Sequence, residues 1–587
     1  MTPRRSVLAL AVLVALATVL DLGHFGPAFT FHGDHERDLR MTERLLAGDW
    51  PDTTPAVAPL PFELGPLAYL VLAPALAVTA DPRLIRAYVA LLAGAGALLL
   101  LVTLGRRVRL DAALLAGFGL LASAFWFEVT SQLWHSSLLI LPVAAWLTMA
   151  ERWLSGRGEP VRCALGLSAL AALSVQLHLT AAVYPLLTLG LLVLRRRELG
   201  WRGLGASVGV GLLVLTPLLV TLGRSLSRGA LVTAGSAGRG WSPASPLEVL
   251  SFVRENVHIL WGDVLGPALS DGLLALAVLG GVVAVRSKDL WSRLLLANVA
   301  LGLLVEWLLL GNQLAHRYLH ANFLALSALV AVGAHAALSW LPGRVTAART
   351  LAATTLVLVA VWLEAWLSHV PHPRHLGWLT ADQQLAVAST VAERFPMPLD
   401  EAPWRIHGLY VSESMGIGWM HRLARRAALP PFHATAHLAV LPSELDLVPF
   451  GTLTGPVTRV RLGPREVLLV PFEPALRDVT VTAGDTLEPL QRPWHAPARQ
   501  AQTRHGDRRI AAQVTRAGTA HLLIQSGRDR GCSVDARLGG LTVLATPAAP
   551  AAKAAYPGLQ LVALELPTTG PLALNLGRCE ALHIDLF

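Results

Sequence analysis

Charged residues are scarce in this sequence. They make up 15% of its 587 residues, and the mean hydropathy is +0.52, whereas soluble domains usually carry about 25% charged residues. The deficit lies mainly in residues 1–369, where blocks rich in Leu, Ala and Val run for about 17–25 residues, the length that crosses a bilayer. The composition excludes an ordinary soluble protein. It predicts a polytopic α-helical membrane protein with residues 370–587 as a water-soluble region.

Cysteine is rare as well, with three in the chain. Cys163 lies in an apolar block and is expected to pack there. Cys532 and Cys579 belong to no Cys-x-x-Cys or Cys/His ligand set, so the sequence predicts no structural metal site. An oxidising compartment would allow a disulfide between them, which the sequence leaves open. No cofactor is predicted, and a divalent cation held by carboxylates stays an open alternative.

Basic residues outnumber acidic ones, and the net charge is +9. A nucleic-acid-binding protein would gather its basic residues on one soluble face. Here they stand in short loops between apolar blocks, which is the pattern that sets membrane topology. The clusters assigned to the cytoplasm are Arg4/Arg5, Arg106/Arg107/Arg109, Arg152/Arg157/Arg162, Arg195/Arg196/Arg197/Arg202, Arg286/Lys288/Arg293 and Arg344/Arg349. One hairpin between successive clusters and one further crossing give about eleven transmembrane helices, with the N-terminus inside and residues 370–587 outside.

Three apolar blocks need a separate interpretation. Residues 6–22 are interpreted as an uncleaved first helix, because no small-residue cleavage pattern follows them. Residues 64–80 contain Pro66 and Pro74, which disfavour a regular helix interior, so this block is predicted to lie on the outer leaflet rather than to cross it. Residues 163–194 have a polar centre, QLHLT, and are predicted to form two spans that meet at the outer face.

The first outer loop covers about residues 23–83 in this topology, and its most polar part reads HGDHERDLR. The sequence predicts a helix over residues 34–47, in which Asp34 follows Gly33 and suits an N-cap. Asp34 and Asp38 are four positions apart, so they share one face of this helix. One interpretation is an amphipathic helix that rests on lipid headgroups, and the other is a functional site.

Several short motifs follow one another along residues 1–340. They are Asp34-x-x-Arg37-Asp38, GPLAYLVLAP at 65–74, Arg86 ahead of the second span, Gly105-Arg106-Arg107, Trp134-His135-Ser136-Ser137, Gln176-Leu177-His178 and His316-Arg317-Tyr318-Leu319. In this order the set resembles GT-C fold glycosyltransferases that use polyprenyl-phosphate sugars. It is most similar to the family of dolichyl-phosphate-mannose–protein mannosyltransferases and bacterial aminoarabinose transferases. Trp134 is followed here by His-Ser, where many bacterial members have Asn-Pro.

The resemblance implies a GT-C glycosyltransferase domain over residues 1–369, in the bacterial inner membrane, with residues 370–587 in the periplasm. It implies a polyprenyl-phosphate sugar as donor and a lipid, glycan or protein as acceptor. A lipid-linked donor suits an outer-face site, because nucleotide sugars are made in the cytoplasm. Such an enzyme needs a carboxylate to accept the acceptor proton and cations that stabilise the departing phosphate.

Asp34 is the predicted general base, with Asp38 or Glu36 as alternatives. A single displacement with one base inverts the configuration at the sugar carbon. The predicted donor phosphate and sugar binders are Arg37, Arg86, Trp134, His135, Gln176, His178, His316 and Arg317. Arginine suits this task because its planar guanidinium donates two parallel hydrogen bonds to phosphate.

Structural roles compete with these assignments. Arg86 could anchor a helix at the membrane interface, and His178 could be a packed histidine at a helix end. Glu306 lies within a predicted span, where a carboxyl group is costly and hints at function, and its structural alternative is a pair with another buried polar group. For the whole protein, the alternatives are a transporter or flippase of lipid-linked sugars and a non-enzymatic scaffold. No convincing internal repeat favours a transporter.

The C-terminal region has a different pattern. A helix is predicted around ADQQLAVASTVAERF, within residues 370–430. Short runs of alternating apolar residues follow, separated by Gly, Pro and Asp, and they predict a β-sandwich or jelly roll. No Gly-rich phosphate loop or nucleophile elbow is present. The expected role is binding of acceptor or glycan, or covering the site, and a passive folding unit is the alternative.

Overall fold

The protein divides into two compact units in the computed structural model. The helical unit consists of residues 1–26, 41–234 and 240–371, and the β-rich unit consists of residues 27–40, 235–239 and 372–587. Apart from a few single positions, the structure describes residues 3–25, 33–49, 66–131, 135–227, 265–310, 320–340, 379–394, 405–408, 437–443, 448–463, 465–483, 508–526, 533–547, 559–577 and 581–586. Cys532 and Cys579 lie outside these ranges, whereas Cys163 is buried and carries a free thiol.

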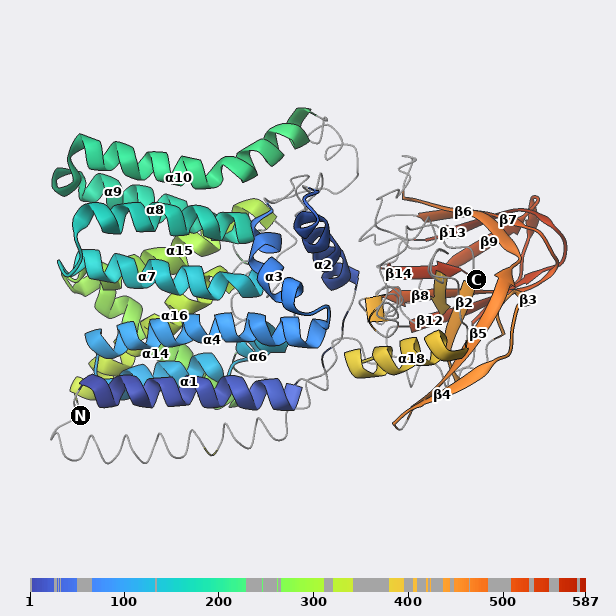
Figure 1. The fold of residues 1–587 in the computed structure, drawn as a ribbon, viewed down its shortest axis with the longest axis horizontal. Coiled ribbons are helices and arrows are strands. Elements are labelled where there is room, and N and C mark those ends of the chain that lie inside the picture. Colours follow the sequence, from blue (N-terminus) through green and yellow to red (C-terminus); the bar gives the residue numbers. More distant parts are fainter. Residues whose placement is uncertain are drawn as a thin grey trace. The chain divides into compact units, whose positions relative to one another are not determined.

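The helical unit is a bundle of apolar helices (Figure 1). Its described helices are α1 (Pro3–Phe25), α3 (Leu67–Val78), α4 (Pro82–Arg107), α5 (Leu110–Leu121), α6 (Ala124–Ser131), η1 (His135–Leu139), α7 (Ile140–Leu154), α8 (Pro160–Leu177), η2 (Leu179–Ala182), α9 (Val183–Leu194), α10 (Arg196–Ser227), α14 (Pro267–Arg286), α15 (Leu290–Leu310) and α16 (His320–Ser339). Among the described residues, seven helices are long and apolar enough to cross a membrane. The expected multi-pass helical architecture is confirmed, and the count of eleven stays a prediction.

The proline-containing block forms a short helix. Helix α3 has 12 residues and contains Pro74, so it measures about 18 Å and is too short to cross a hydrocarbon core of about 30 Å. The next helix, α4, starts at Pro82, where the Asp81 carboxylate accepts a hydrogen bond of 2.9 Å from the Arg83 backbone N–H. This N-cap and the proline at the first helical position favour the start of a new helix at this point.

The QLHLT segment separates two helices, as the sequence predicted. Helix α8 ends at Leu177, and His178 adopts an extended backbone with φ −159° and ψ 134°. The one-turn helix η2 and then α9 follow. A polar break between two apolar helices is tolerated where its backbone groups find partners inside the protein.

Three loops that the arginine pattern assigned to the cytoplasm meet at one end of the helical unit. Arg107 at the end of α4 contacts Asp289, in the turn between α14 and α15, at 2.5 Å, and Glu151 of α7 at 3.3 Å. Arg157 also pairs with Glu151. Burial raises the pKa of Asp289, but the hydrogen bonds from Ser292 and the charge of Arg107 outweigh it and hold that pKa below its ordinary value. These contacts agree with the prediction from the arginine pattern that the three loops lie on the same side of the membrane.

Helices α14 and α16 cross at glycine. A Cβ atom on Gly280 would lie 2.1 Å from the Leu329 carbonyl oxygen, and one on Gly333 would lie 1.9 Å from the Leu276 carbonyl oxygen. The two backbones therefore touch at this crossing, which is the packing that small residues permit between membrane helices.

The described residues of the β-rich unit form helix α18 (Ala381–Arg394), as predicted, and three sheets. The first sheet has the order β1-β2-β5-β3, with β4 also paired to β5, the second β10-β9-β13-β7-β6 and the third β11-β12-β8-β14. The strands are β1 (Arg405–Gly408), β2 (His437–Pro442), β3 (Gly451–Leu453), β4 (Thr458–Leu462), β5 (Arg465–Pro474), β6 (Leu476–Ala483), β7 (Arg508–Val514), β8 (Gly518–Ser526), β9 (Val534–Leu538), β10 (Leu541–Thr542), β11 (Ala545–Pro547), β12 (Leu559–Leu566), β13 (Gly570–Leu576) and β14 (Ala581–Leu586).

The second and third sheets form the expected sandwich. Alternate residues of β13, namely Leu572, Leu574 and Leu576, are buried against the third sheet, as the two-residue period of a strand requires. On the other face of the third sheet, Leu523 and Leu561 pack against the first sheet. Strand β5 of the first sheet falls in a run that predicted a strand, GPREVLLVPFEP, whereas a separate sheet with the parallel pair β1 and β2 was not predicted.

We expect the stability of the β-rich unit to fall as the pH drops below about 6.5, the ordinary pKa of histidine. Burial of His521 on β8 lowers its pKa more than the Val448 backbone and the Glu565 carboxylate raise it. Unfolding then takes up a proton in the window between the lowered folded pKa and 6.5, so stability rises with pH there. Hydrogen exchange of β8 and β12 in the intact protein, corrected for intrinsic rates, should show protection weakening from pH 7.5 to 5.5. His521→Gln should remove most of that dependence, and an unchanged profile in this variant would refute the assignment.

Candidate active site

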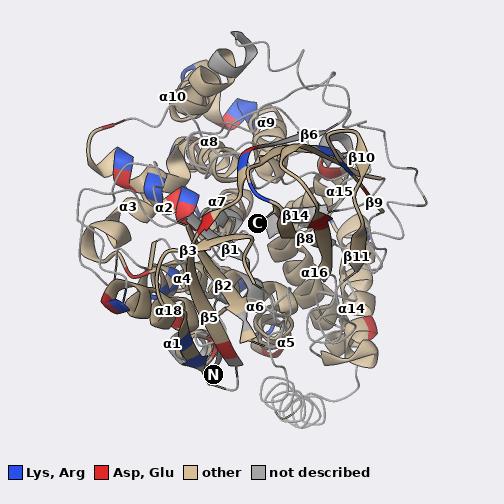
Figure 2. Ribbon diagram, turned by 90° about the vertical axis from the view of Figure 1, so that its right-hand side faces the viewer, with Lys and Arg blue, Asp and Glu red and all other residues tan. Residues whose placement is uncertain are grey.

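The predicted acidic helix exists and begins one residue early. Helix α2 runs Gly33–Leu46, so Asp34 lies in its first turn rather than at the N-cap, and the Asp34 side chain is outside the described part of the chain. Basic and acidic residues alternate along α2, whereas the helices of the helical unit carry few charges along their length (Figure 2). Residues 27–40, including the first turns of α2, belong to the β-rich unit, a grouping that the sequence pattern does not reveal.

The two alternative bases are held in ion pairs. The Arg40 Nε donates a hydrogen bond of 2.7 Å to Glu36 Oε1, one helical turn away. The Arg37 Nε donates one of 2.9 Å to Asp38 Oδ1. Glu36 is 3% exposed and Asp38 is 4% exposed, so each buried carboxylate has a guanidinium that compensates its charge. Because of these pairs, Glu36, Arg37 and Asp38 each already have a structural role.

Aromatic rings fix the start of the acidic segment. His35 is 1% exposed and its ring stacks on Phe29, with centroids 5.8 Å apart, and lies 5.9 Å from the ring of Phe31. The Phe29 carbonyl accepts a hydrogen bond of 2.7 Å from the Ala381 N–H, and the Phe31 carbonyl accepts one of 2.8 Å from Gln384 Nε2. The start of α18 therefore anchors the chain just ahead of Asp34.

Within the helical unit, the Arg86 side chain is buried among the ends of the helices. It is 4% exposed, and its Nη2 donates a hydrogen bond of 3.3 Å to the Leu22 carbonyl near the end of α1. The neighbouring Asp21 is 1% exposed and its Oδ2 accepts a hydrogen bond of 2.6 Å from the indole of Trp126 on α6. Its burial shows that the Arg86 side chain packs inside the bundle, and both its binding of donor and its role as an interface anchor stay predictions.

Asp21 and Trp126 were missed at the sequence level. The available signal was a carboxylate inside the first apolar block, since an ionisable residue at such a position is rarely accidental. What the sequence cannot supply is the partner, which lies 105 positions away. Together with Arg86, this pair joins the end of α1 to α4 and α6.

Gln176 and His178 form hydrogen bonds at helix ends. Gln176 Nε2 donates to the Val214 carbonyl at 2.6 Å. His178 Nδ1 lies 2.8 Å from Thr180 Oγ1, and the ring caps η2. Both side chains are buried, in line with the packed-histidine alternative, and their binding of donor stays a prediction.

The remaining predicted binders cannot be compared with the structure. Trp134, His316 and Arg317 lie outside the described residues, and His135 opens η1 with a side chain that is not described. Glu306 is fully buried, and its Oε1 accepts a hydrogen bond of 2.8 Å from Asn322 Nδ2. This is the buried polar pair that stood as the structural alternative for Glu306, and it links α15 to α16.

Carboxylates, cysteines and histidines do not gather as metal ligands in the described part of the chain, where no group of three or more could hold an ion. Asp21, Glu36 and Asp38 instead each contact an N–H donor. The described site residues fall into two sets. One is the acidic segment with Glu36, Arg37 and Asp38, and the other is the buried group around Arg86.

The helical bundle and its appended sheets have the architecture of a multi-pass membrane protein with the GT-C fold. The apo structure of ArnT from Cupriavidus metallidurans shares this fold, with a TM-score of 0.51, 15% sequence identity and coverage of 78% of this chain and 97% of that chain. The structure of the same protein bound to undecaprenyl phosphate gives a TM-score of 0.51, 13% identity and the same coverage. The fold expected from the motifs is confirmed.

A more distant likeness is to the arabinosyltransferase EmbB from Mycobacterium smegmatis, with a TM-score of 0.41, 12% identity and coverage of 97% of this chain and 64% of that chain. No family model and no curated protein sequence matches the chain.

Proposed function

We propose that this protein is a membrane glycosyltransferase that transfers a sugar from a polyprenyl-phosphate donor to an acceptor at the outer face of the bacterial inner membrane. The observation that carries the proposal is the fold shared with ArnT, which was solved with undecaprenyl phosphate bound, across 97% of that protein's length. The ordered motifs of residues 1–340 support the same activity. The β-rich unit lies in the periplasm in this proposal, as the arginine count predicts.

The chemistry is a single displacement with inversion. The Asp34 carboxylate accepts the proton of the acceptor hydroxyl while that oxygen attacks the anomeric carbon. The carbon–oxygen bond to the polyprenyl phosphate breaks, and the phosphate leaves with the electron pair. Arg86 and the predicted binders Arg37, His178, His316 and Arg317 stabilise the charge that develops on this phosphate. No metal ion is required by this scheme.

The acidic segment supports the role of Asp34. Arg40 and Arg37 compensate the charges of the neighbouring carboxylates Glu36 and Asp38. These two carboxylates therefore add little net negative charge around the first turn of α2. The aromatic contacts of His35 and the hydrogen bonds from α18 fix the backbone of this turn. A base that must meet a hydroxyl within hydrogen-bond reach gains from such fixation.

The test is transfer by the purified, reconstituted protein. Vesicles with a radiolabelled polyprenyl-phosphate sugar pool, mixed with membranes from cells that lack the protein, should yield labelled acceptor and free polyprenyl phosphate. Lipids of those cells should accumulate the carrier-linked sugar. If the protein moves the labelled lipid across the vesicle membrane and no polyprenyl phosphate is released, it is a flippase and the proposal is wrong.

A further inference from the structure

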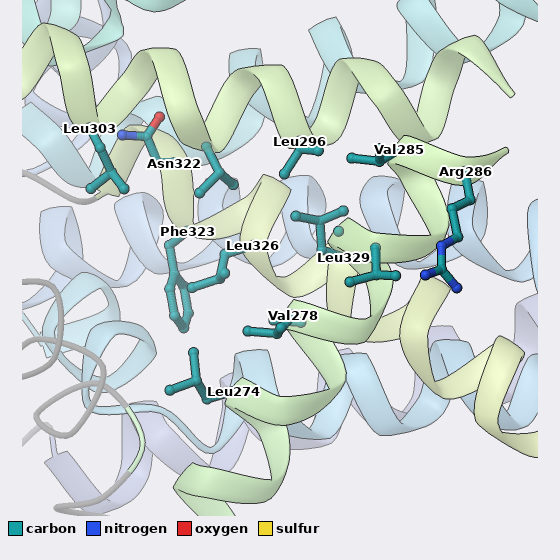
Figure 3. Close-up of a pocket in the computed structure, with 14 residues that line it drawn as sticks. Leu274, Val278, Val285, Arg286, Leu296, Leu303, Asn322, Phe323, Leu326 and Leu329 are labelled. Atoms are coloured by element: carbon teal, nitrogen blue, oxygen red, sulfur yellow. The ribbon is translucent and has the colours of Figure 1, made fainter. Parts of the chain in front are cut away.

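An apolar cavity of about 530 Å³ lies among α14, α15 and α16. Its wall is almost wholly aliphatic, and the main contributors are Leu274, Val278, Val285, Leu296, Leu303 and Leu326. Two polar residues are the exceptions. Figure 3 shows Asn322 beside Leu303 at one end of the cavity and Arg286 at the other. Asn322 already donates to Glu306, so the charge that is available to a ligand is that of Arg286.

The cavity faces the surroundings of the helical unit. Val278 is 60% exposed, Val282 is 40% exposed and Val285 is 63% exposed, all on α14. Within a helix that crosses a membrane, such a surface meets lipid chains rather than water. An aliphatic wall offers water none of the polar partners that it needs. A hydrocarbon chain is the occupant that this wall fits.

The part of the cavity that lies along α14 is about as long as one leaflet. Leu274 and Arg286 are twelve positions apart on α14, which is about 18 Å of helix. Half of a bilayer hydrocarbon core is about 15 Å. A single acyl chain that starts at Arg286 would therefore reach the level of Leu274 near the membrane midplane.

Unpaired cations mark the Arg286 end. Arg286, Lys288 and Arg293 are exposed, and no carboxylate among the described residues pairs with any of the three. The nearby Asp289 is engaged by Arg107 at 2.5 Å. The same end carries the arginine-rich loops that the charge pattern assigns to the cytoplasm. Basic residues beside a membrane helix attract anionic lipid headgroups of that leaflet.

We propose that the cavity among α14, α15 and α16 binds one acyl chain of an anionic phospholipid of the cytoplasmic leaflet, with its phosphate at Arg286, Lys288 and Arg293. The three basic residues lie at the end of the helices where α4 finishes with Arg107, whereas Arg86 lies near the start of α4. The lipid site goes beyond the proposed function and does not depend on it.

Native mass spectrometry of the intact protein, titrated with phosphatidylglycerol and with phosphatidylcholine, tests the site. Wild type should bind phosphatidylglycerol more tightly. The triple variant Arg286→Gln, Lys288→Gln, Arg293→Gln should weaken phosphatidylglycerol binding about tenfold or more and leave phosphatidylcholine binding little changed. Val278→Trp, which fills the cavity, should weaken binding of both lipids. The matched control is Arg202→Gln, because Arg202 is an exposed arginine of α10 and does not line the cavity.

Two results would overturn the proposal. The first is phosphatidylglycerol binding that the triple variant retains at the wild-type level. The second is that undecaprenyl phosphate displaces phosphatidylglycerol from wild type and that Val278→Trp weakens the binding of undecaprenyl phosphate. The cavity would then hold a prenyl tail. The triple variant changes exposed positions and should fold. It therefore tests the proposal even if Val278→Trp does not fold. Sugar transfer by the triple variant is measured separately, so a failure of the proposed function is distinguishable.

Discussion

Replacing Asp34 by Asn is expected to reduce sugar transfer from a polyprenyl-phosphate donor by about 100- to 10,000-fold, the usual contribution of a general base. The amide keeps the size of the side chain but cannot accept the proton of the attacking hydroxyl. Because the position lies in the first turn of α2, the substitution should leave the thermal unfolding midpoint nearly unchanged. The measurement is transfer of labelled sugar by the reconstituted variant at saturating donor.

Asp49→Asn is the matched control for this substitution. Asp49 is an acidic residue of the same loop, it is 57% exposed and it pairs with Arg44, and such exposed pairs are worth about 0–1 kcal/mol. Its substitution should leave transfer intact. Full activity in Asp34→Asn would remove the base assignment. If Asp38→Asn instead abolishes transfer in a folded protein, the base is Asp38 and its pair with Arg37 opens during the reaction.

Replacing Gly333 by Ala is expected to destabilise the helical unit by about 3 kcal/mol or more, at the upper end of the cost of overpacking. The new Cβ would lie 1.9 Å from the Leu276 carbonyl oxygen, which is backbone and cannot rotate away. Helices α14 and α16 would have to separate along their crossing, with loss of the contacts that close packing provides. Thermal unfolding of the detergent-solubilised protein should show a markedly lower midpoint.

Gly272→Ala separates this effect from the general change of glycine to alanine. Gly272 lies in α14, and a Cβ there would meet no atom within 4 Å. Alanine is favoured over glycine in a helix by about 1 kcal/mol, so this variant should be neutral or slightly more stable. Equal midpoints for Gly333→Ala and Gly272→Ala would show that the crossing is not tightly packed.

Local patterns in the sequence predicted much of the fold. Apolar blocks predicted the helices, Pro66 and Pro74 marked the short helix α3, and QLHLT marked the break between α8 and α9. Alternating residues predicted the strands of the sandwich. These features depend on interactions between near neighbours in the chain, such as helix hydrogen bonds and turn chemistry, so the order of residues specifies them.

Contacts between distant segments were beyond such patterns. Arg86 was predicted as a donor binder, with an anchor at the membrane interface as the alternative, and the sequence did not predict its contact with the Leu22 carbonyl near the end of α1. Asp21 and Trp126, which lie 105 positions apart and share a hydrogen bond, were not singled out. Each outcome depends on which backbone or side chain arrives from elsewhere, and a single sequence carries no signal for that.

The sequence by itself determined the class of protein, the side of the membrane expected for its loops and the existence of an acidic helix after the first apolar block. These features follow from the spacing of apolar residues and the positions of charges, which can be read within single segments of the chain. Only the tertiary structure decided that α18 anchors the residues ahead of Asp34 across some 350 positions, through Gln384 and Phe31, and that α14 and α16 touch at Gly280 and Gly333. The physical reason is that burial and close approach belong to pairs of segments, and their free energy arises only when both are in place.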